Sequence, residues 1–165
     1  MATYRLQQEL LPSLLDRITD LEPRNRNEAP QNRPQALREM RVGLRRDLEW
    51  LLNTRRRITP VPEWRRELSN SLFTYGLPDL ANFSLNSDRD QMRLTSVLEG
   101  VIEAFEPRLK NVLVSLVPVA SGTRMLKFQI EGVLRVEPAP ERILFDTTLD
   151  LACMEYRVEG ESSAR

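Results

Sequence analysis

The stretch Ser87–Val119 reads SDRDQMRLTSVLEGVIEAFEPRLKNVLVSLVPV, and its hydrophobic period changes halfway along. Up to Phe105 the apolar residues recur at steps of three and four, which predicts an amphipathic helix with Ser87 as its amino-terminal cap. Residues 112–117 are rich in β-branched side chains, which predicts a strand buried on much of both faces. Pro107 ends the helix near Phe105 or Glu106, because proline lacks an amide hydrogen and restricts the residue before it. The apolar stripe of the helix consists of Leu94, Val97, Leu98, Val101, Ile102 and Phe105.

The junction between this helix and this strand carries one acid and one guanidinium, Glu106 and Arg108, on either side of Pro107. Two interpretations are open. In the first, Arg108 pairs with Glu106 or with nearby carbonyls and only holds the turn. In the second, the three residues form a contact for a partner protein. We therefore treat Glu106, Pro107 and Arg108 as candidate site residues.

The composition is that of a single soluble globular domain. The 165 residues are 41% hydrophobic and 29% charged, which is enough for one ordinary core. No apolar run reaches the roughly 18 to 20 residues that a membrane-spanning helix needs, so no membrane insertion is expected. The amino end, MATYRLQQE, lacks the basic start and apolar centre of a secretory signal. These features predict a cytoplasmic protein.

The chain lacks the residues for most catalytic and metal chemistry. It has no histidine and one cysteine, which excludes His-assisted nucleophilic catalysis, the usual zinc sites and an internal disulfide. We expect Cys153 to be an inert thiol packed in a strand. The six glycines form no phosphate-binding loop, so nucleotide chemistry is not expected. The sequence predicts no metal and no cofactor.

The net charge is zero, but the charges are unevenly spread along the chain. Residues 1–66 contain 14 arginines against 9 acids, whereas residues 67–165 contain 10 basic residues against 15 acids. Two differently charged faces suit orientation within an assembly. The run Arg55–Arg57 keeps a nucleic-acid-binding module as an alternative. The chain has neither a strongly basic balance nor aromatic residues between the arginines, so no nucleic-acid partner is expected.

The first 33 residues are predicted to be an anchor segment followed by a flexible polar linker. A short helix is expected over Pro12–Ile18, where proline suits the first turn. This helix either packs on its own domain or lies in a groove of another subunit, since so short a helix is not stable by itself. Its candidate contact residues are Leu14, Leu15, Arg17 and Ile18. Residues 19–33 are almost entirely polar or proline, which is typical of an exposed linker.

Residues 34–158 are predicted to form one α+β domain, with residues 159–165 as a polar tail. We expect a helix from Pro34 to about Thr54 and a short helix from about Trp64 to Phe73, closed by Gly76. The helix before Pro107 follows, and then a small, mainly antiparallel carboxy-terminal sheet of about three strands. A sheet this small has exposed edges, and an edge can accept a strand from another chain.

Five segments, in this order along the chain, resemble the TssE family of type VI secretion baseplate subunits. This family is related to the small wedge protein of contractile phage baseplates and is also labelled lysozyme-like. The segments are Ser13–Ile18 (SLLDRI), Arg46–Arg55 (RDLEWLLNTR), Tyr75–Asp79 (YGLPD), Phe105–Leu109 (FEPRL) and Phe145–Asp150 (FDTTLD).

The resemblance implies a structural protein in the cytoplasm of a Gram-negative bacterium, at the inner face of the cell envelope. It implies a wedge complex with TssF and TssG, and a platform on which the sheath proteins TssB and TssC begin to assemble by strand exchange. TssK is a further candidate neighbour. Carried over by position, Glu106, Pro107 and Arg108 are the core motif of the family, and the amino-terminal leucine segment is a candidate wedge anchor.

The lysozyme-like label makes a muramidase-like hydrolase the remaining alternative. Such chemistry needs two carboxylates about 5 to 9.5 Å apart, one of them with a raised pKa. Glu99 and Glu103 are expected on the solvated side of the helix, opposite its apolar stripe, where water keeps a carboxylate pKa ordinary. We therefore expect a non-catalytic protein.

Overall fold

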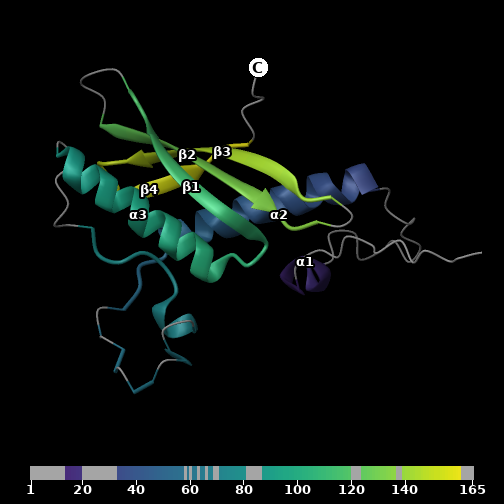
Figure 1. The fold of residues 1–165 in the computed structure, drawn as a ribbon, viewed down its shortest axis with the longest axis horizontal. Helices are drawn as coiled ribbons and strands as arrows, with labels where there is room; N and C mark the ends of the chain where they lie inside the picture. Colours follow the sequence, from purple (N-terminus) through teal and green to yellow (C-terminus); the bar gives the residue numbers. More distant parts are fainter. Residues whose placement is uncertain are drawn as a thin grey trace, which may run out of the picture.

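The computed structural model describes residues 14–19, 33–57, 59, 61–62, 64–65, 67–68, 71–80, 87–119, 124–136 and 139–160 (Figure 1). The described helices are α1 (Leu14–Ile18), α2 (Arg33–Asn53), the short 3-10 helix η2 (Leu72–Thr74) and α3 (Asp88–Phe105). The strands are β1 (Leu109–Val117), β2 (Met125–Leu134), β3 (Glu141–Asp150) and β4 (Glu155–Val158). The predicted α+β class with a carboxy-terminal antiparallel sheet is confirmed.

The two long helices begin and end close to where the sequence predicts. α3 stops at Phe105, and the backbone N–H of Glu106 donates to the carbonyl of Ile102 at 2.8 Å as the last helical bond. Pro107 follows directly, so the predicted proline stop is confirmed. Ser87 occupies the amino-terminal cap position, but its hydroxyl makes no capping hydrogen bond. Two aspartates in the first turn, Asp88 and Asp90, suit the positive end of the helix dipole instead.

The sheet is an antiparallel meander of four strands in the order β1-β2-β3-β4, one strand more than expected. The additional strand, β4, is only four residues long and pairs with the end of β3, from Thr147↔Val158 to Asp150↔Glu155. Its shortness hides the alternation that a strand needs to be recognised. Cys153 lies exposed in the turn between β3 and β4, so the prediction of a packed thiol in a strand is wrong.

β1 is buried on one face, not on both as the sequence predicted. Val112 and Val114 face the core, whereas Leu113 between them is 54% exposed. The reason is that β1 is an edge strand and only one face of the sheet is covered by helices. A bulge between Lys110 and Leu113 bends the strand there, and Asn111 takes a left-handed conformation with φ 53°.

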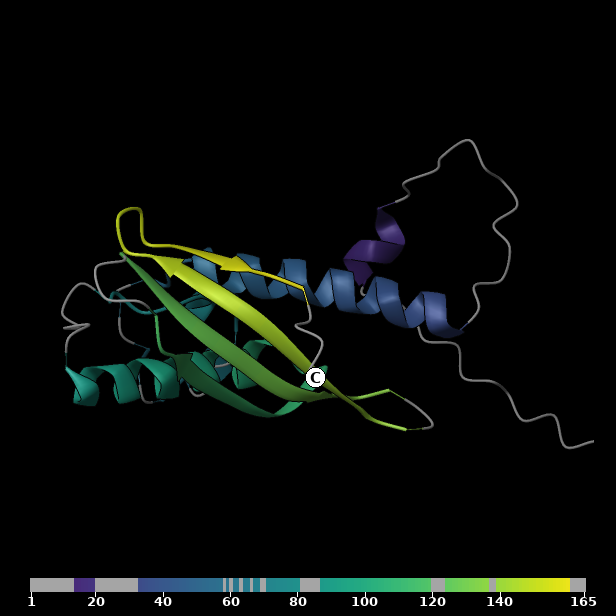
Figure 2. The same ribbon diagram turned by 90° about the horizontal axis from the view of Figure 1, so that it is seen from above.

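The molecule has two layers, with α2 and α3 on the same face of the sheet (Figures 1 and 2). α2 packs along the β4 side, and α3 packs along the β1 side. Alternate residues of the strands point into the core between the layers. The most deeply buried core residues are Leu44, Leu48, Leu94, Leu98, Ile102, Leu109, Phe128, Ile130, Leu134 and Leu149.

The segment between α2 and α3 returns to the end of α2 instead of forming the single short helix that was expected. Its described part includes η2 and an isolated parallel bridge between Arg55 and Leu77. Gly76 has a φ of 101°, so the predicted glycine turn is confirmed. A Cβ at this position would lie 2.3 Å from the carbonyl oxygen of Thr54, so only glycine fits.

The expected linker at 19–33 and the tail at 159–165 fall mostly outside the described residues. α1 is described, and Figure 2 shows it against the side of α2.

Candidate functional site

The turn Glu106–Pro107–Arg108 is held by a bidentate ion pair between its two charged side chains. The guanidinium of Arg108 donates from Nε to Glu106 Oε1 at 2.6 Å and from Nη2 to Glu106 Oε2 at 2.5 Å. The backbone N–H of Arg108 also donates to Glu106 Oε1, at 3.2 Å. Glu106 is 5% exposed, and a buried carboxylate needs such a paired and hydrogen-bonded environment. The internal pairing that was one of the two interpretations is therefore present.

Helix α2 supplies a second carboxylate to the same guanidinium. Arg108 Nη2 lies 2.6 Å from Oδ2 of Asp47, which joins the turn to a residue 61 positions earlier. Three hydrogen bonds thus fix the Arg108 side chain, which directs its charge into the protein and away from solvent. This contact was not identified from the sequence.

The chain of ion pairs continues from Asp47 to α1. Arg46 Nη2 donates to Asp47 Oδ1 at 2.9 Å and to Asp16 Oδ1 at 2.7 Å. Asp16 lies over Gly43, where an added Cβ would be only 2.9 Å from its Oδ2. α1 and the turn at Pro107 are thereby connected through a single row of alternating charges, Asp16–Arg46–Asp47–Arg108–Glu106, which we call the charge row.

The charge row shifts the ionisation of the groups in and beside it. The carboxylates of Glu106 and Asp47 raise the pKa of Arg108 despite its partial burial, so its positive charge is permanent. Asp16 and Asp47 likewise raise the pKa of Arg46. Burial raises the pKa of Tyr75 as well, and the negative charges of Asp47 and Glu106 add to that effect.

The predicted amino-terminal contact residues divide into two groups. Leu15 and Ile18 are 45% and 71% exposed, so these apolar side chains are largely turned to solvent. The side chains of Leu14 and Arg17 lie outside the described residues. Among the side chains of α1 that the structure describes, Asp16 reaches the body, and it was not among the predicted contacts. The described side chains of α1 therefore place its acid against α2 and leave two apolar groups exposed.

The free edge of β4 is closed by side chains of α2. Asn53 accepts from the backbone N–H of Tyr156 at 2.8 Å and donates to the carbonyl of the same residue at 2.7 Å, as a neighbouring strand would. Two positions on, the N–H of Val158 donates to Glu49 Oε2 at 3.0 Å. This edge therefore has few unpaired backbone groups to offer.

Among the residues that the structure describes, one side chain caps the free edge of β1. Glu99 of α3 accepts a hydrogen bond from the backbone N–H of Val114 at 2.9 Å. The expectation that Glu99 lies on the solvated side of its helix is therefore wrong; Glu103 is exposed as expected. Because backbone groups alternate in direction along the regular part of a strand, the N–H of Leu116, two residues after Val114, also points to this edge. In the described part of the chain, no bond to the Leu116 N–H closes the edge.

The carboxylates at the junction accept hydrogen bonds from donors of the protein itself. Both oxygens of Glu106 accept hydrogen bonds from Arg108, and Glu99 binds a backbone N–H. Within the described ranges, no group of three or more acids and cysteines is gathered as a metal ion would require. No helix among these residues has the length and apolar character to cross a bilayer.

Fold and site together define a small α+β protein whose charged residues hold a turn and leave one strand edge accessible. The sequence model of one family, described as baseplate wedge protein gp25, matches residues 38–139, more than half of the chain. The protein belongs to this family of baseplate wedge proteins, which agrees with the resemblance found in the sequence. The match spans the charge row from Arg46 to Arg108 and the paired strands β1 and β2. A comparison with curated proteins found no match.

Proposed function

We propose that this protein is a non-catalytic structural subunit of a type VI secretion baseplate, working in the cytoplasm at the inner face of the cell envelope. It joins a wedge complex with TssF and TssG, with TssK as a further neighbour, and starts the assembly of the TssB–TssC sheath at a sheet edge. The observation that carries the proposal is the charge row, because it fixes Pro107 and the first residues of β1 in one rigid corner. A rigid, exposed corner is what a subunit needs to orient a neighbour.

The strand edge proposed to receive the sheath is that of β1. β4 is disfavoured because Asn53 and Glu49 occupy its backbone groups. At β1, Glu99 is the side chain of the described residues that must leave before an incoming strand can pair with Val114. Backbone pairing would supply affinity, and the exposed Leu113 would supply a side-chain contact.

The amino-terminal segment is proposed as the second contact with the wedge. Asp16 attaches α1 to α2, and the exposed apolar side chains of Leu15 and Ile18 are free to enter an apolar groove of TssF or TssG. Within this proposal Leu14 and Arg17 extend the same contact. Glu106, Pro107 and Arg108 are proposed to act together, with Pro107 as the exposed surface and the two charged residues as its support.

The hydrolase alternative is disfavoured by the partners of the carboxylates. A muramidase needs one carboxyl group that donates a proton to the sugar bond. Glu106 instead accepts from Arg108 through both oxygens. The nucleic-acid alternative is disfavoured because the run has no aromatic residue between its arginines, and the guanidinium of Arg57 already lies 5.8 Å from the ring centroid of Phe73.

Two purifications test the proposal. The full-length protein is expected to co-purify with co-expressed TssF–TssG, and the protein lacking residues 1–33 is expected to bind less well. In the second purification, Leu116→Pro removes an edge-facing N–H of β1 without removing a bond to β2. This variant is expected to keep TssF–TssG and to lose the ability to start TssB–TssC assembly. Failure of the full-length protein to bind TssF–TssG contradicts the wedge role, and normal sheath assembly on the Leu116→Pro variant contradicts the β1 edge.

A further inference from the structure

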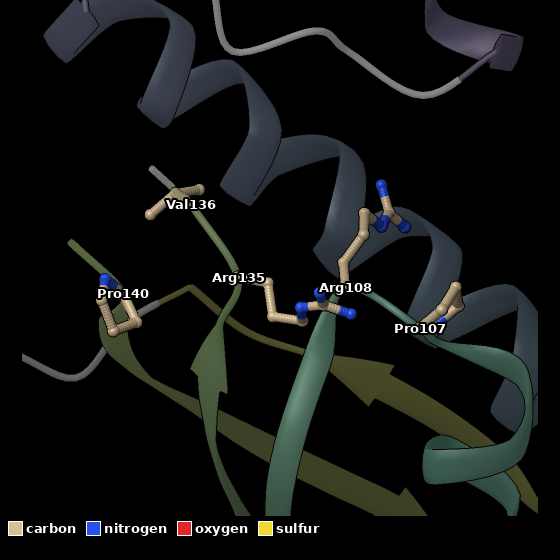
Figure 3. A pocket seen from close by; sticks show the side chains of 5 residues that line it. All are labelled: Pro107, Arg108, Arg135, Val136 and Pro140. Carbon is tan, nitrogen blue, oxygen red and sulfur yellow. The ribbon is translucent and has the colours of Figure 1, made fainter. Parts of the chain in front are cut away.

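A shallow pocket of about 440 Å³ lies beside the turn at Pro107 (Figure 3). Its lining comes from the start of β1, the end of β2 and the residue before β3, so three separate segments meet there. The lining residues are Pro107, Arg108, Arg135, Val136 and Pro140. Two rigid proline rings and a valine form an apolar floor, and two arginines supply the polar groups. A concave apolar surface with a few placed polar groups is the usual form of a recognition site.

The two arginines of the pocket differ in what they can offer a ligand. Arg108 is occupied by Glu106 and Asp47, and Figure 3 shows its side chain directed toward α2. Arg135 is exposed, and no carboxylate or carbonyl in the described part of the chain pairs with its guanidinium. With respect to the described residues, Arg135 is therefore the cation of the pocket whose donors remain available.

Arg135 is nonetheless held in a defined place by its backbone. Its N–H donates to the carbonyl of Arg108 at 2.9 Å, which extends the β1–β2 ladder by one step. The next residue, Val136, is buried. A free guanidinium on a fixed backbone can bind a planar anion without ordering a loop, which lowers the entropic cost of binding.

Charged residues of both signs lie near Arg135. Glu141, which pairs opposite Leu134, is neutralised by Arg41 at 2.7 Å. Val133, two residues before Arg135, pairs with Lys110 of β1 on one side and with Arg142 of β3 on the other. The side chains of Lys110 and Arg142 are both exposed. Glu131 approaches Arg142 only at 3.9 Å. We name Lys110, Arg135 and Arg142 the basic corner. Its charge favours an acidic ligand over a neutral or basic one.

We propose that the pocket binds an acidic segment of a partner protein, with a carboxylate on Arg135 and an apolar side chain on the proline floor. This inference rests on the proposed wedge function, and it gives Arg135, not Arg108, the direct contact with the partner. The basic corner is too small and has no aromatic residue for stacking bases, so a protein segment fits it better than a nucleic acid.

The test uses nuclear magnetic resonance with the ¹⁵N-labelled full-length chain and two short probes. The first probe is the peptide acetyl-Leu-Glu-Glu-Leu-amide, and the second has Gln in place of both Glu residues. Saturable shifts of the Arg135 and Val136 amides are expected with the Glu peptide only, and they should weaken as salt is added. Arg135→Gln is expected to reduce the affinity by about tenfold, as loss of a charge-assisted bond does. Arg45→Gln, which changes an exposed arginine of α2, should have no effect.

Any of three results of the titrations would overturn the inference: equal shifts with the Gln peptide, unchanged binding by Arg135→Gln, or tighter binding of oligouridylate than of the Glu peptide. An unchanged melting temperature for Arg135→Gln is expected, because its side chain has no partner within the described residues. A TssF–TssG pull-down with Arg135→Glu is run in parallel. If wild type fails to bind TssF–TssG, the wedge role fails while the peptide titration still decides the pocket. If wild type and Arg135→Glu bind equally, the inference fails and the wedge role stands.

Discussion

Asn53, the last residue of α2, binds both backbone groups of Tyr156, accepting from its N–H at 2.8 Å and donating to its carbonyl at 2.7 Å. One side chain thus takes the place of a fifth strand beside β4. Tyr156 is itself in the core, so its backbone groups would otherwise lack partners away from water. The contact ties the end of the longest helix to the last strand of the sheet.

Replacing Asn53 with Ala is expected to lower the free energy of unfolding by about 2 kcal/mol, because it leaves a buried donor and a buried acceptor unpaired. The Tyr156 amide should then exchange its hydrogen faster, which hydrogen exchange followed by mass spectrometry measures. Arg45→Ala, on the exposed side of the same helix, is the control and should change the stability by no more than about 0.5 kcal/mol. Equal stabilities for the two variants would show that the Asn53 contact contributes nothing.

Replacing Arg108 with Ala is expected to destabilise the protein by about 3 kcal/mol, because Glu106 would be left as a buried charge without its partner. Urea denaturation measures the change. The double variant Glu106→Gln with Arg108→Met removes both charges and should be more stable than Arg108→Ala alone. If the double variant is the less stable of the two, the cost does not come from an uncompensated carboxylate.

Two glycines give a matched pair of opposite predictions. Gly100 lies in α3 with open space around the position of a Cβ, so Gly100→Ala should raise the free energy of unfolding by about 1 kcal/mol. Gly76→Ala should lower it by at least about 2 kcal/mol, because its left-handed conformation and the carbonyl of Thr54 exclude a side chain. Thermal unfolding of both variants checks this. A Gly76→Ala protein as stable as wild type would contradict the turn geometry.

Burial raises the pKa of Tyr156 well above its ordinary value, and its hydroxyl has no hydrogen-bond partner within the described residues. The folded state keeps this proton when the unfolded chain releases it, so the contribution of Tyr156 to stability is complete below about pH 10 and is lost as the pH rises further. At pH 7, the free energy of unfolding of Tyr156→Phe should equal that of wild type or exceed it by up to about 1 kcal/mol. It should also show a smaller fall in stability between pH 9 and pH 11.

Urea unfolding of wild type and Tyr156→Phe across this pH range makes the comparison. Some alkaline loss should remain in the variant, because the pKa of Tyr75 is raised too. Parallel curves for the two proteins would mean that the phenol of Tyr156 is not shielded from water.

Much of the fold follows from local patterns that a sequence shows directly. The three-four spacing of apolar residues predicts α2 and α3, Pro107 predicts where α3 ends, and Gly76 predicts the turn after η2. These features depend on side chains only a few positions apart, so no knowledge of the tertiary structure is needed. The short strand β4 and the one-sided burial of β1 were missed, because each depends on what packs beside the strand.

Some residues of the candidate site were identified from the sequence, and others were found only in the structure. The motif Glu106–Pro107–Arg108 was identified from the sequence, and so was the possibility that its two charges pair with each other. The role of Asp47 was not identified, because no nearby residue in the sequence indicates that an acid on a helix will contact an arginine 61 residues later. The signal for Arg135 was equally weak, because one arginine after a strand is common and only the pocket distinguishes it.

By itself, the amino-acid sequence determined the helices, the helix-to-strand break and the family to which the chain belongs, because these depend on spacing and on short motifs. Only the tertiary structure decided which sheet edge is closed and which arginine is free. Those outcomes depend on the partners that distant residues find when the helices pack on the sheet, as Asn53 finds Tyr156 and Arg108 finds Asp47. The sequence determines how many groups can form hydrogen bonds, but the folded structure determines which partner each group finds.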